Sequence, residues 1–371
     1  MAHAAISCIG LMTAGGDCPG LNAVIRAVGR CALARKIEVR GIADGFLGLM
    51  ERRVMPLNDE SFAGILTLGG TILGTSNKCD PSRYAVGKDS AGSVVFEDRT
   101  RACMETIRGE GFDAVVMAGG DGSMTVASKL VAFADAHGQS VNFIGLPKTI
   151  DNDLCGTEIT FGFQTAVSIA TEALDRLHTT AASHHRVMVV EVMGRNSGWI
   201  ALHAGVASGA DVILIPEIPF DLGRVCATAV ARGMRGKRFT IICVSEGARP
   251  VGGEQIVARF DPTSPDPVRL GGVAKFLSDE IEKRTGLESR HVVLGHVQRG
   301  GTPVAGDREL ATRLGYHAIE LLLAGKRNRV AVIQGNRLAD VPLEEAARQR
   351  TIPRDEPLLA AARAIGTSFG D

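Results

Sequence analysis

The chain has 371 residues, of which 41 are Lys or Arg and 41 are Asp or Glu, so the net charge is zero with neutral histidines. This balance excludes a general electrostatic attraction to nucleic acid or to a membrane surface, and acidic ligands would have to be met by local clusters of cations. The length suits one large or two medium domains, and 45 glycines with only 4% aromatic residues favour Val-, Ile- and Ala-rich parallel sheets with many tight turns.

Short apolar runs alternate with helical patterns along the chain. Strands are predicted at residues 6–12, 113–117, 141–146, 186–193, 211–215, 239–244 and 330–333, and helices at residues 21–35, 123–136, 163–179, 222–235, 273–284 and 310–323. This alternation predicts an α/β protein: two Rossmann-like α/β/α sandwich domains with mostly parallel sheets and an active-site cleft between them. Residues 249–272, rich in Gly, Pro and Asp, are expected to form a plain surface loop, and the residues after 337 a peripheral helix or two.

Several features bear on where the protein works. No apolar run approaches the roughly 18 residues that would span a bilayer. The first five residues, MAHAA, lack a basic segment followed by a long apolar stretch, so no signal peptide is expected. The eight cysteines have no CxxC spacing and are expected to be free thiols rather than a disulfide framework or a zinc site. We therefore expect a cytoplasmic protein that binds neither membranes nor nucleic acid.

The motif PKTIDND, at residues 147–153, carries the densest chemistry of the chain. It follows the predicted buried strand at residues 141–146, and open α/β sheets bind their ligands at the carboxyl ends of strands. Its two carboxylates, Asp151 and Asp153, are two positions apart and can share one concave site. One can then act as a general base while the other lies near a cation.

Two glycine clusters lie between predicted strands and helices, at residues 13–20 (TAGGDCPG) and 119–123 (GGDGS). Glycines let backbone N–H groups approach a phosphate closely, and a helix N-terminus adds a favourable dipole. The alternative for the first cluster is a tight strand–helix turn. In the second cluster, Asp121 suits a Mg²⁺ site, and a helix cap is the alternative. Neither cluster matches the P-loop or the dinucleotide-binding pattern.

Three further loops follow predicted strands and bring charged residues to strand ends. Arg195 can clamp a phosphate, Glu246 can accept hydrogen bonds from sugar hydroxyls, and His296 and Arg299 lie in a glycine-rich stretch suited to an anion. Each alone has a simpler alternative, namely a solvated arginine or a structural histidine. It is their shared placement that points to a phosphorylated sugar and a phosphate donor.

The combination of MTAGGDCPGLN, AGGDGS, PKTIDND, VEVMGR, VSEGA and LGHVQRGG resembles the 6-phosphofructokinase family over roughly residues 6–323. The resemblance implies transfer of a phosphoryl group to the 1-hydroxyl of fructose 6-phosphate in glycolysis. It implies that Asp151 takes the proton from that hydroxyl, that Thr149 and Arg195 act on the transferred group, and that Asp121 and Asp153 hold Mg²⁺. By the same resemblance, the donor-site residues are Gly15, Asn77, Lys78, Gly120, Asp121, Gly122 and Ser123. The implied sugar-phosphate residues are Thr149, Asp151, Arg186, Met193, Gly194, Arg195, Glu246, Arg290, His296 and Arg299.

The resemblance also implies an organisation. Residues 1–162 with 298–345 would bind the phosphoryl donor, residues 163–297 the sugar phosphate, and residues 346–371 would form a C-terminal helical tail. Arg186 and Arg290 match arginines that reach a neighbouring subunit's site in the family. The resemblance therefore implies a homodimer or homotetramer with shared active sites.

The donor is the open question, because two positions that distinguish ATP from pyrophosphate enzymes disagree. Gly122 matches the ATP pattern, since an aspartate there would crowd and repel the nucleotide's α-phosphate. Lys148 matches the pyrophosphate pattern, and this mixture resembles the family's mixed-substrate branch. Asn77 stands where bacterial ATP enzymes have an arginine, and Lys78 could substitute for it. The sequence predicts ATP with Mg²⁺, with a pyrophosphate-dependent phosphotransferase as the alternative.

Other readings explain less of the sequence. An NAD or lipid kinase shares the GGDG pattern but would not be expected to carry the other motifs. An inactive regulatory subunit should have lost Asp121, Asp151 or Arg195, which are all present. A dehydrogenase should carry a GxGxxG turn. An inherited effector pocket near Arg26 and Arg30 is less favoured than a solvated basic surface.

Overall fold

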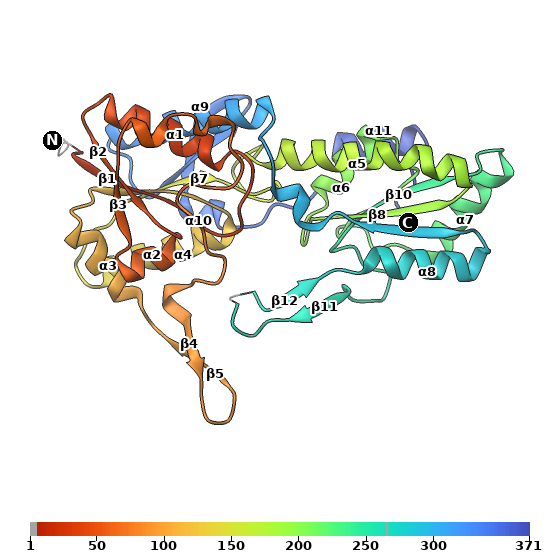
Figure 1. Ribbon diagram of the computed structural model, residues 1–371, viewed down its shortest axis with the longest axis horizontal. Helices are drawn as coiled ribbons and strands as arrows, with labels where there is room; N and C mark the ends of the chain where they lie inside the picture. Colours follow the sequence, from red (N-terminus) through yellow and green to blue (C-terminus); the bar gives the residue numbers. More distant parts are fainter. Residues whose placement is uncertain (1–5, 265) are drawn as a thin grey trace.

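The computed structural model describes residues 6–264 and 266–371 and contains two α/β bodies side by side (Figure 1). The expectation that the chain starts without a signal peptide rests on residues 1–5, which lie outside the described residues. Among the described helices, none combines the length and apolar character needed to cross a bilayer. All eight cysteines are free thiols.

The first body is built on a seven-stranded sheet with the order β15-β14-β7-β6-β1-β2-β3. Its inner strands pair in parallel, whereas the edge strands β3 and β15 pair antiparallel with their neighbours. Its strands are β1 (Cys8–Thr13), β2 (Glu38–Ile42), β3 (Val54–Leu57), β6 (Ala114–Gly119), β7 (Phe143–Pro147), β14 (Arg329–Gln334) and β15 (Arg337–Pro342).

Both faces of this sheet are covered, because the central strands are apolar on both sides. Along β1, Ile9 and Leu11 pack into one core, and Cys8 and Met12 into the core on the opposite face. Helices α1 (Leu21–Leu33) and α9 (Ala305–Leu323) cover the first face. The second face is covered by α2 (Phe46–Glu51), α3 (Thr100–Gly109), α4 (Asp121–Ala136) and α10 (Leu343–Ala346) (Figure 1).

The second body is built on a four-stranded parallel sheet with the order β13-β8-β10-β9. Its strands are β8 (Val187–Val192), β9 (Val212–Leu214), β10 (Thr240–Ser245) and β13 (Ser289–Val293). Helices α5 (Phe163–His184), α6 (Trp199–Ala207) and α11 (Pro357–Ala364) cover one face, and α7 (Leu222–Met234) and α8 (Val273–Thr285) the other (Figure 1). The core beneath α5 and α6 is continuous with the core beneath α1 and α9, so one apolar cluster joins the two bodies.

The predicted α/β class and mostly parallel sheets are confirmed, and each predicted strand and helix has a counterpart in the structure. The prediction of a plain loop at residues 249–272 was wrong. This segment contains an antiparallel hairpin of β11 (Val257–Phe260) and β12 (Val268–Leu270). Both strands are short and solvent-accessible, so they lack the buried apolar run on which the strand predictions relied.

The residues after 337 also differ from the prediction of helices alone. They begin with the edge strand β15, whose partly polar sequence pairs antiparallel with β14. The final residues return to the second body, where Ser368 forms a β-bridge with Val212 and Phe369 is buried. A second hairpin, β4 (Tyr84–Lys88) with β5 (Val94–Glu97), extends from the first body (Figure 1) and was not expected.

Candidate active site

A cavity of about 920 Å³ lies between the two bodies, at the carboxyl ends of β1, β6, β7, β8 and β10. Parallel strands bring their carboxyl ends to one edge of a sheet, which is why motifs far apart in the sequence meet there. The predicted residues that line the cavity are Gly15, Asn77, Gly120, Asp121, Gly122, Ser123, Lys148, Thr149, Asp151, Asp153, Met193, Arg195, Glu246, His296 and Arg299.

The PKTIDND motif turns sharply as it leaves β7, with Asn152 in the left-handed region at a φ of 52°. The Asn152 side-chain oxygen accepts a hydrogen bond from the Thr160 N–H at 3.0 Å, which fixes the turn. The Thr149 hydroxyl donates to Asp153 Oδ1 at 3.0 Å and accepts from the Asp151 N–H at 3.1 Å. The turn therefore places three polar side chains on the cavity wall.

Asp151 has a side-chain oxygen that the fold does not use. Its Oδ1 is buried and has no hydrogen-bond partner among the described residues. Burial raises the pKa of Asp151 above its ordinary value, Arg299 lowers it, and the negative charge of Glu246 raises it. A carboxylate with a raised pKa and a vacant acceptor oxygen suits the abstraction of a proton from a hydroxyl.

The two glycine clusters converge on one side of the cavity. Gly15 has a φ of 82°, and a Cβ on it would lie 3.3 Å from both Lys148 Nζ and the Ser123 hydroxyl. A Cβ at Gly119 would lie 2.4 Å from that of Ser123, so the turn into α4 requires glycine. The first glycine turn and the start of α4 thus line the cavity together, an arrangement suited to phosphate.

Gly122 and Lys148, which disagree about the donor, have different surroundings. A Cβ on Gly122 would meet no atom within 4 Å, so a longer side chain there would extend into the cavity. Lys148 is only 4% exposed, and its ammonium donates to the carbonyl oxygen of Gly16 at 2.5 Å. Burial lowers the pKa of Lys148. The Lys148 ammonium therefore holds the first glycine turn by a hydrogen bond, and the space beside Gly122 stays open.

Asp121 and Asp153 lie on the same side as the glycine clusters. Burial raises the pKa of Asp153, and the negative charges of Asp151 and Asp121 raise it further. Within residues 6–264 and 266–371, no group of three or more His, Cys, Asp or Glu side chains is arranged to hold a metal ion. Two carboxylates beside a phosphate cradle nevertheless fit Mg²⁺, which commonly takes one or two carboxylates together with substrate phosphates and water.

The opposite wall of the cavity comes from the second body. Gly194 has a φ of 130°, and a Cβ there would lie 2.6 Å from the Ser245 hydroxyl, so this residue shapes the wall without lining it. The neighbouring Arg195 and the half-buried Glu246 line the cavity, and burial raises the pKa of Glu246. Arg299 donates to the Asp17 carbonyl oxygen at 3.0 Å and so links this wall to the first glycine turn.

Four predicted residues do not line the cavity: Gly194, described above, and three cations. Arg186 and Arg290 both pair with Glu288 Oε1, at 2.8 and 2.6 Å, at the ends of β8 and β13. Lys78 pairs with Asp261 of the segment before β12 at 3.0 Å. All three cations therefore pair with carboxylates of the same chain outside the cavity lining.

Comparison with known proteins identifies the family. The family model described as Phosphofructokinase matches residues 8–322. The chain belongs to the phosphofructokinase family. It is 47% identical to ATP-dependent 6-phosphofructokinase 2 of Clostridium perfringens, and 46% identical to a pyrophosphate–fructose 6-phosphate 1-phosphotransferase of Streptomyces coelicolor. The alignments cover 98% of this chain in both cases, and 98% and 99% of the relatives.

A solved structure of phosphofructokinase from Saccharomyces cerevisiae superimposes with a TM-score of 0.78 at 30% sequence identity. The match covers 97% of this chain but 46% of the yeast chain, so this chain spans less than half of that relative's length. Relatives of both donor types are about equally similar to this chain, and overall identity does not separate ATP from pyrophosphate.

Sequence reasoning missed several residues that line the cavity of this family member. Arg259 and Arg269 come from the hairpin β11–β12, within the segment expected to be a plain loop. Gln349 lies beyond the part matched by the family, and its amide donates to Asp121 Oδ2 at 2.8 Å. VARF does not alternate and VRL is only three residues long, so neither strand of the hairpin has a clear sequence signal. No local pattern marks Gln349.

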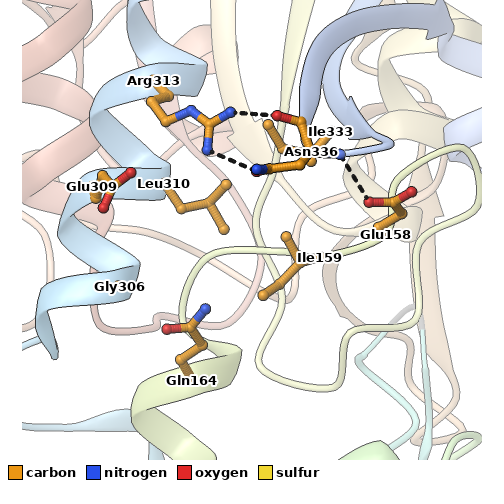
Figure 2. A pocket seen from close by; sticks show the side chains of 9 residues that line it. All are labelled: Glu158, Ile159, Gln164, Gly306, Glu309, Leu310, Arg313, Ile333 and Asn336. Carbon is orange, nitrogen blue, oxygen red and sulfur yellow. Dashed lines mark hydrogen bonds between the residues drawn. The ribbon is translucent and has the colours of Figure 1, made fainter.

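A second, smaller cavity of about 360 Å³ lies beside α9 (Figure 2). Two of its charged side chains are engaged within the fold: Glu158 accepts from the Gly335 N–H at 2.6 Å, and Arg313 donates to the Asn336 carbonyl oxygen at 2.9 Å (Figure 2). Its walls contain neither a glycine turn nor a cluster of cations among the described residues. The larger cavity is therefore the better phosphate site.

Proposed function

We infer that this chain is an ATP-dependent 6-phosphofructokinase, which transfers the γ-phosphate of ATP to the 1-hydroxyl of D-fructose 6-phosphate in glycolysis. Full-length similarity to enzymes with that name supports the activity. The observation that carries the chemistry is Asp151, whose buried, unpartnered Oδ1 faces a cavity between a glycine-lined wall and a wall with Arg195 and Glu246.

The geometry suits in-line transfer, which depends on positioning and charge neutralisation more than on covalent catalysis. In our proposal Asp151 Oδ1 takes the proton of the 1-hydroxyl, and Arg195 and the Thr149 hydroxyl act on the transferred group. The glycine turns around Gly15 and Gly120 hold the donor phosphates. Magnesium, held by Asp121 and Asp153, would neutralise negative charge on the donor.

The remaining assignments follow the two bodies. We propose that residues 1–162 with 298–345 bind the donor and that residues 163–297 bind the sugar phosphate, with residues 346–371 as a C-terminal tail. Met193, Gly194, Glu246, His296 and Arg299 would shape the sugar-phosphate pocket. We also propose that the protein acts in the cytoplasm.

ATP is the proposed donor because Gly122 leaves open space and Lys148 is committed to the Gly16 carbonyl. Pyrophosphate remains the second candidate. The buried ammonium of Lys148 beside the glycine turn and the similarity to the Streptomyces coelicolor pyrophosphate enzyme both favour it. Purified protein assayed with each donor separates the two, and activity with pyrophosphate but none with ATP would overturn the proposal.

We further propose a homodimer or homotetramer with shared sites. Arg186 and Arg290 lie outside this chain's own cavity, where both pair with Glu288 and Arg290 also lies 3.5 Å from Glu282. In a dimer or tetramer they would complete the sugar-phosphate pocket of a neighbouring subunit.

Asp151→Asn tests the proposed reaction. The variant keeps the size of the side chain but removes the base, so kcat should fall by about 10²- to 10⁴-fold with fructose 6-phosphate binding nearly unchanged. Near-normal kcat in this variant would refute the role of Asp151. Ser183→Ala, on the outer surface of α5, is a matched control for purification and folding.

A further inference from the structure

The hairpin β11–β12 reaches from the second body toward the first (Figure 1) and contributes side chains to the large cavity. Its position is held at both ends. At its base, the buried Glu191 accepts hydrogen bonds from the backbone N–H groups of Gly272, at 3.1 Å, and Ala274, at 2.9 Å. Toward the first body, Asp261 pairs with Lys78 at 3.0 Å.

Within the cavity, the carboxylate of Asp266 pairs with Arg195. Arg269 lies on the other side of the same residue, and its guanidinium donates to the Asp266 carbonyl oxygen at 3.0 Å and to the Ser264 hydroxyl at 2.9 Å. Two guanidinium groups thus meet around one aspartate. Among the described residues Arg269 has no carboxylate partner, although it is only partly exposed and lines the cavity.

The charges do not balance at this point of the cavity. Two guanidinium groups lie beside Asp266, but only Arg195 pairs with its carboxylate, whereas Arg269 donates to its backbone carbonyl oxygen. The carboxylate is weakly held because the Asp266 side chain is 53% exposed. Exposed ion pairs contribute little free energy, so an incoming phosphate could displace Asp266 from Arg195 at small cost. A phosphate dianion would then satisfy both guanidinium groups, which are suited to two-pronged contact with phosphate oxygens.

The position of Arg195 indicates which phosphate this is. Burial and the neighbouring charge of Arg269 lower the pKa of Arg195, whereas Glu246 on the sugar side and Asp121 on the donor side raise it. Arg195 comes from the second body and lines the same cavity as Asp121 and Asp151 of the first body, so it faces the space through which the transferred group would pass. A ligand of Arg195 and Arg269 together would be that group rather than the 6-phosphate.

We propose that Arg269 is a further phosphate-binding residue of the active site, which contacts the transferred phosphoryl group beside Arg195, and that Asp266 occupies the place of this group while the site is empty. The inference rests on the proposed function. It assigns a role to a hairpin that the sequence alone presented as a plain loop.

The test compares two ligands that differ only in the group concerned. Fructose 1,6-bisphosphate carries the transferred phosphate and fructose 6-phosphate does not. Calorimetric titration of Arg269→Gln should show a dissociation constant about tenfold or more higher for the bisphosphate, with that for fructose 6-phosphate changed less than about twofold. An equal effect on both ligands, or no effect on either, would overturn the proposal.

Two further variants keep the outcome interpretable. Asp266→Asn should tighten bisphosphate binding by about threefold, because Arg195 is no longer held by a carboxylate, and unchanged or weaker binding would count against the proposal. Arg249→Gln removes one positive charge at the exposed start of the same segment, outside the cavity, and should leave both affinities unchanged. A wild-type protein without activity on fructose 6-phosphate would refute the proposed function itself, which separates the two failures.

Discussion

Gly122→Asp should weaken the use of ATP while leaving the fold intact. A Cβ at this position meets nothing within 4 Å, so the new side chain enters open cavity and displaces no packed atom. Its carboxylate would then lie near the phosphates of the nucleotide. At about 5 Å and an effective dielectric constant of about 20, two unit charges interact with about 3 kcal/mol, or roughly a hundredfold in binding.

Bound magnesium and solvent would reduce this repulsion, so we expect kcat/KM for ATP to fall by about 10- to 100-fold. A coupled assay that follows formation of fructose 1,6-bisphosphate measures the change with either donor. Pyrophosphate has no α-phosphate bearing a nucleoside, so the new carboxylate has less to repel. Any activity with pyrophosphate should therefore decrease less than the activity with ATP. Unaltered kcat/KM for ATP in Gly122→Asp would refute the reasoning.

Gly122→Asn is the matched control, because it adds nearly the same volume without the charge. If repulsion dominates, Gly122→Asn should retain most of the ATP activity that Gly122→Asp loses. If both variants lose activity equally, crowding rather than charge explains the preference for glycine. Thermal unfolding of both proteins should match the wild type within a few degrees, since neither side chain meets a neighbour.

Two other predictions concern the base and the subunits. Burial raises the pKa of Asp151, and the base must be ionised to accept a proton. The value of kcat/KM for fructose 6-phosphate should therefore fall about tenfold per pH unit below that raised pKa. A kcat/KM that does not change with pH down to the ordinary aspartate pKa of 3.8 would contradict this prediction. Co-expression of Asp151→Asn subunits with Arg186→Ala subunits should restore activity at about a quarter of the sites, because each hybrid interface contains one site with both residues intact. If the mixture is no more active than the separate variants, the sites are not shared.

Much of the fold and of the site was predictable because the information is local. The buried runs that became β1, β6, β7, β8 and β10 are apolar throughout, and the polar motifs begin where these runs end. A parallel sheet then forces those ends together. This is why residues from Gly15 to Arg299, predicted from their motifs, line a single cavity.

The strands β11, β12 and β15 escaped prediction because they are exposed or only partly buried and carry mixed polar sequences. Their pairing depends on backbone hydrogen bonds with a partner strand more than on an apolar face, and such pairing leaves little trace in composition. The hairpin arginines and the aspartates that hold Lys78 and Arg195 were missed for the same reason.

The sequence alone determined the α/β class, the family resemblance and the chemistry of the strand-end loops, because glycine turns, carboxylates and buried strands are properties of short segments. Only the tertiary structure decided which charges face one another. The Gln349 amide donates a hydrogen bond to Asp121, 228 positions earlier in the chain, and Asp266 pairs with Arg195. Outside the chain's own cavity, Arg186 and Arg290 both pair with Glu288. Such contacts depend on how the two bodies and the hairpin pack, and no local pattern of residues specifies that packing.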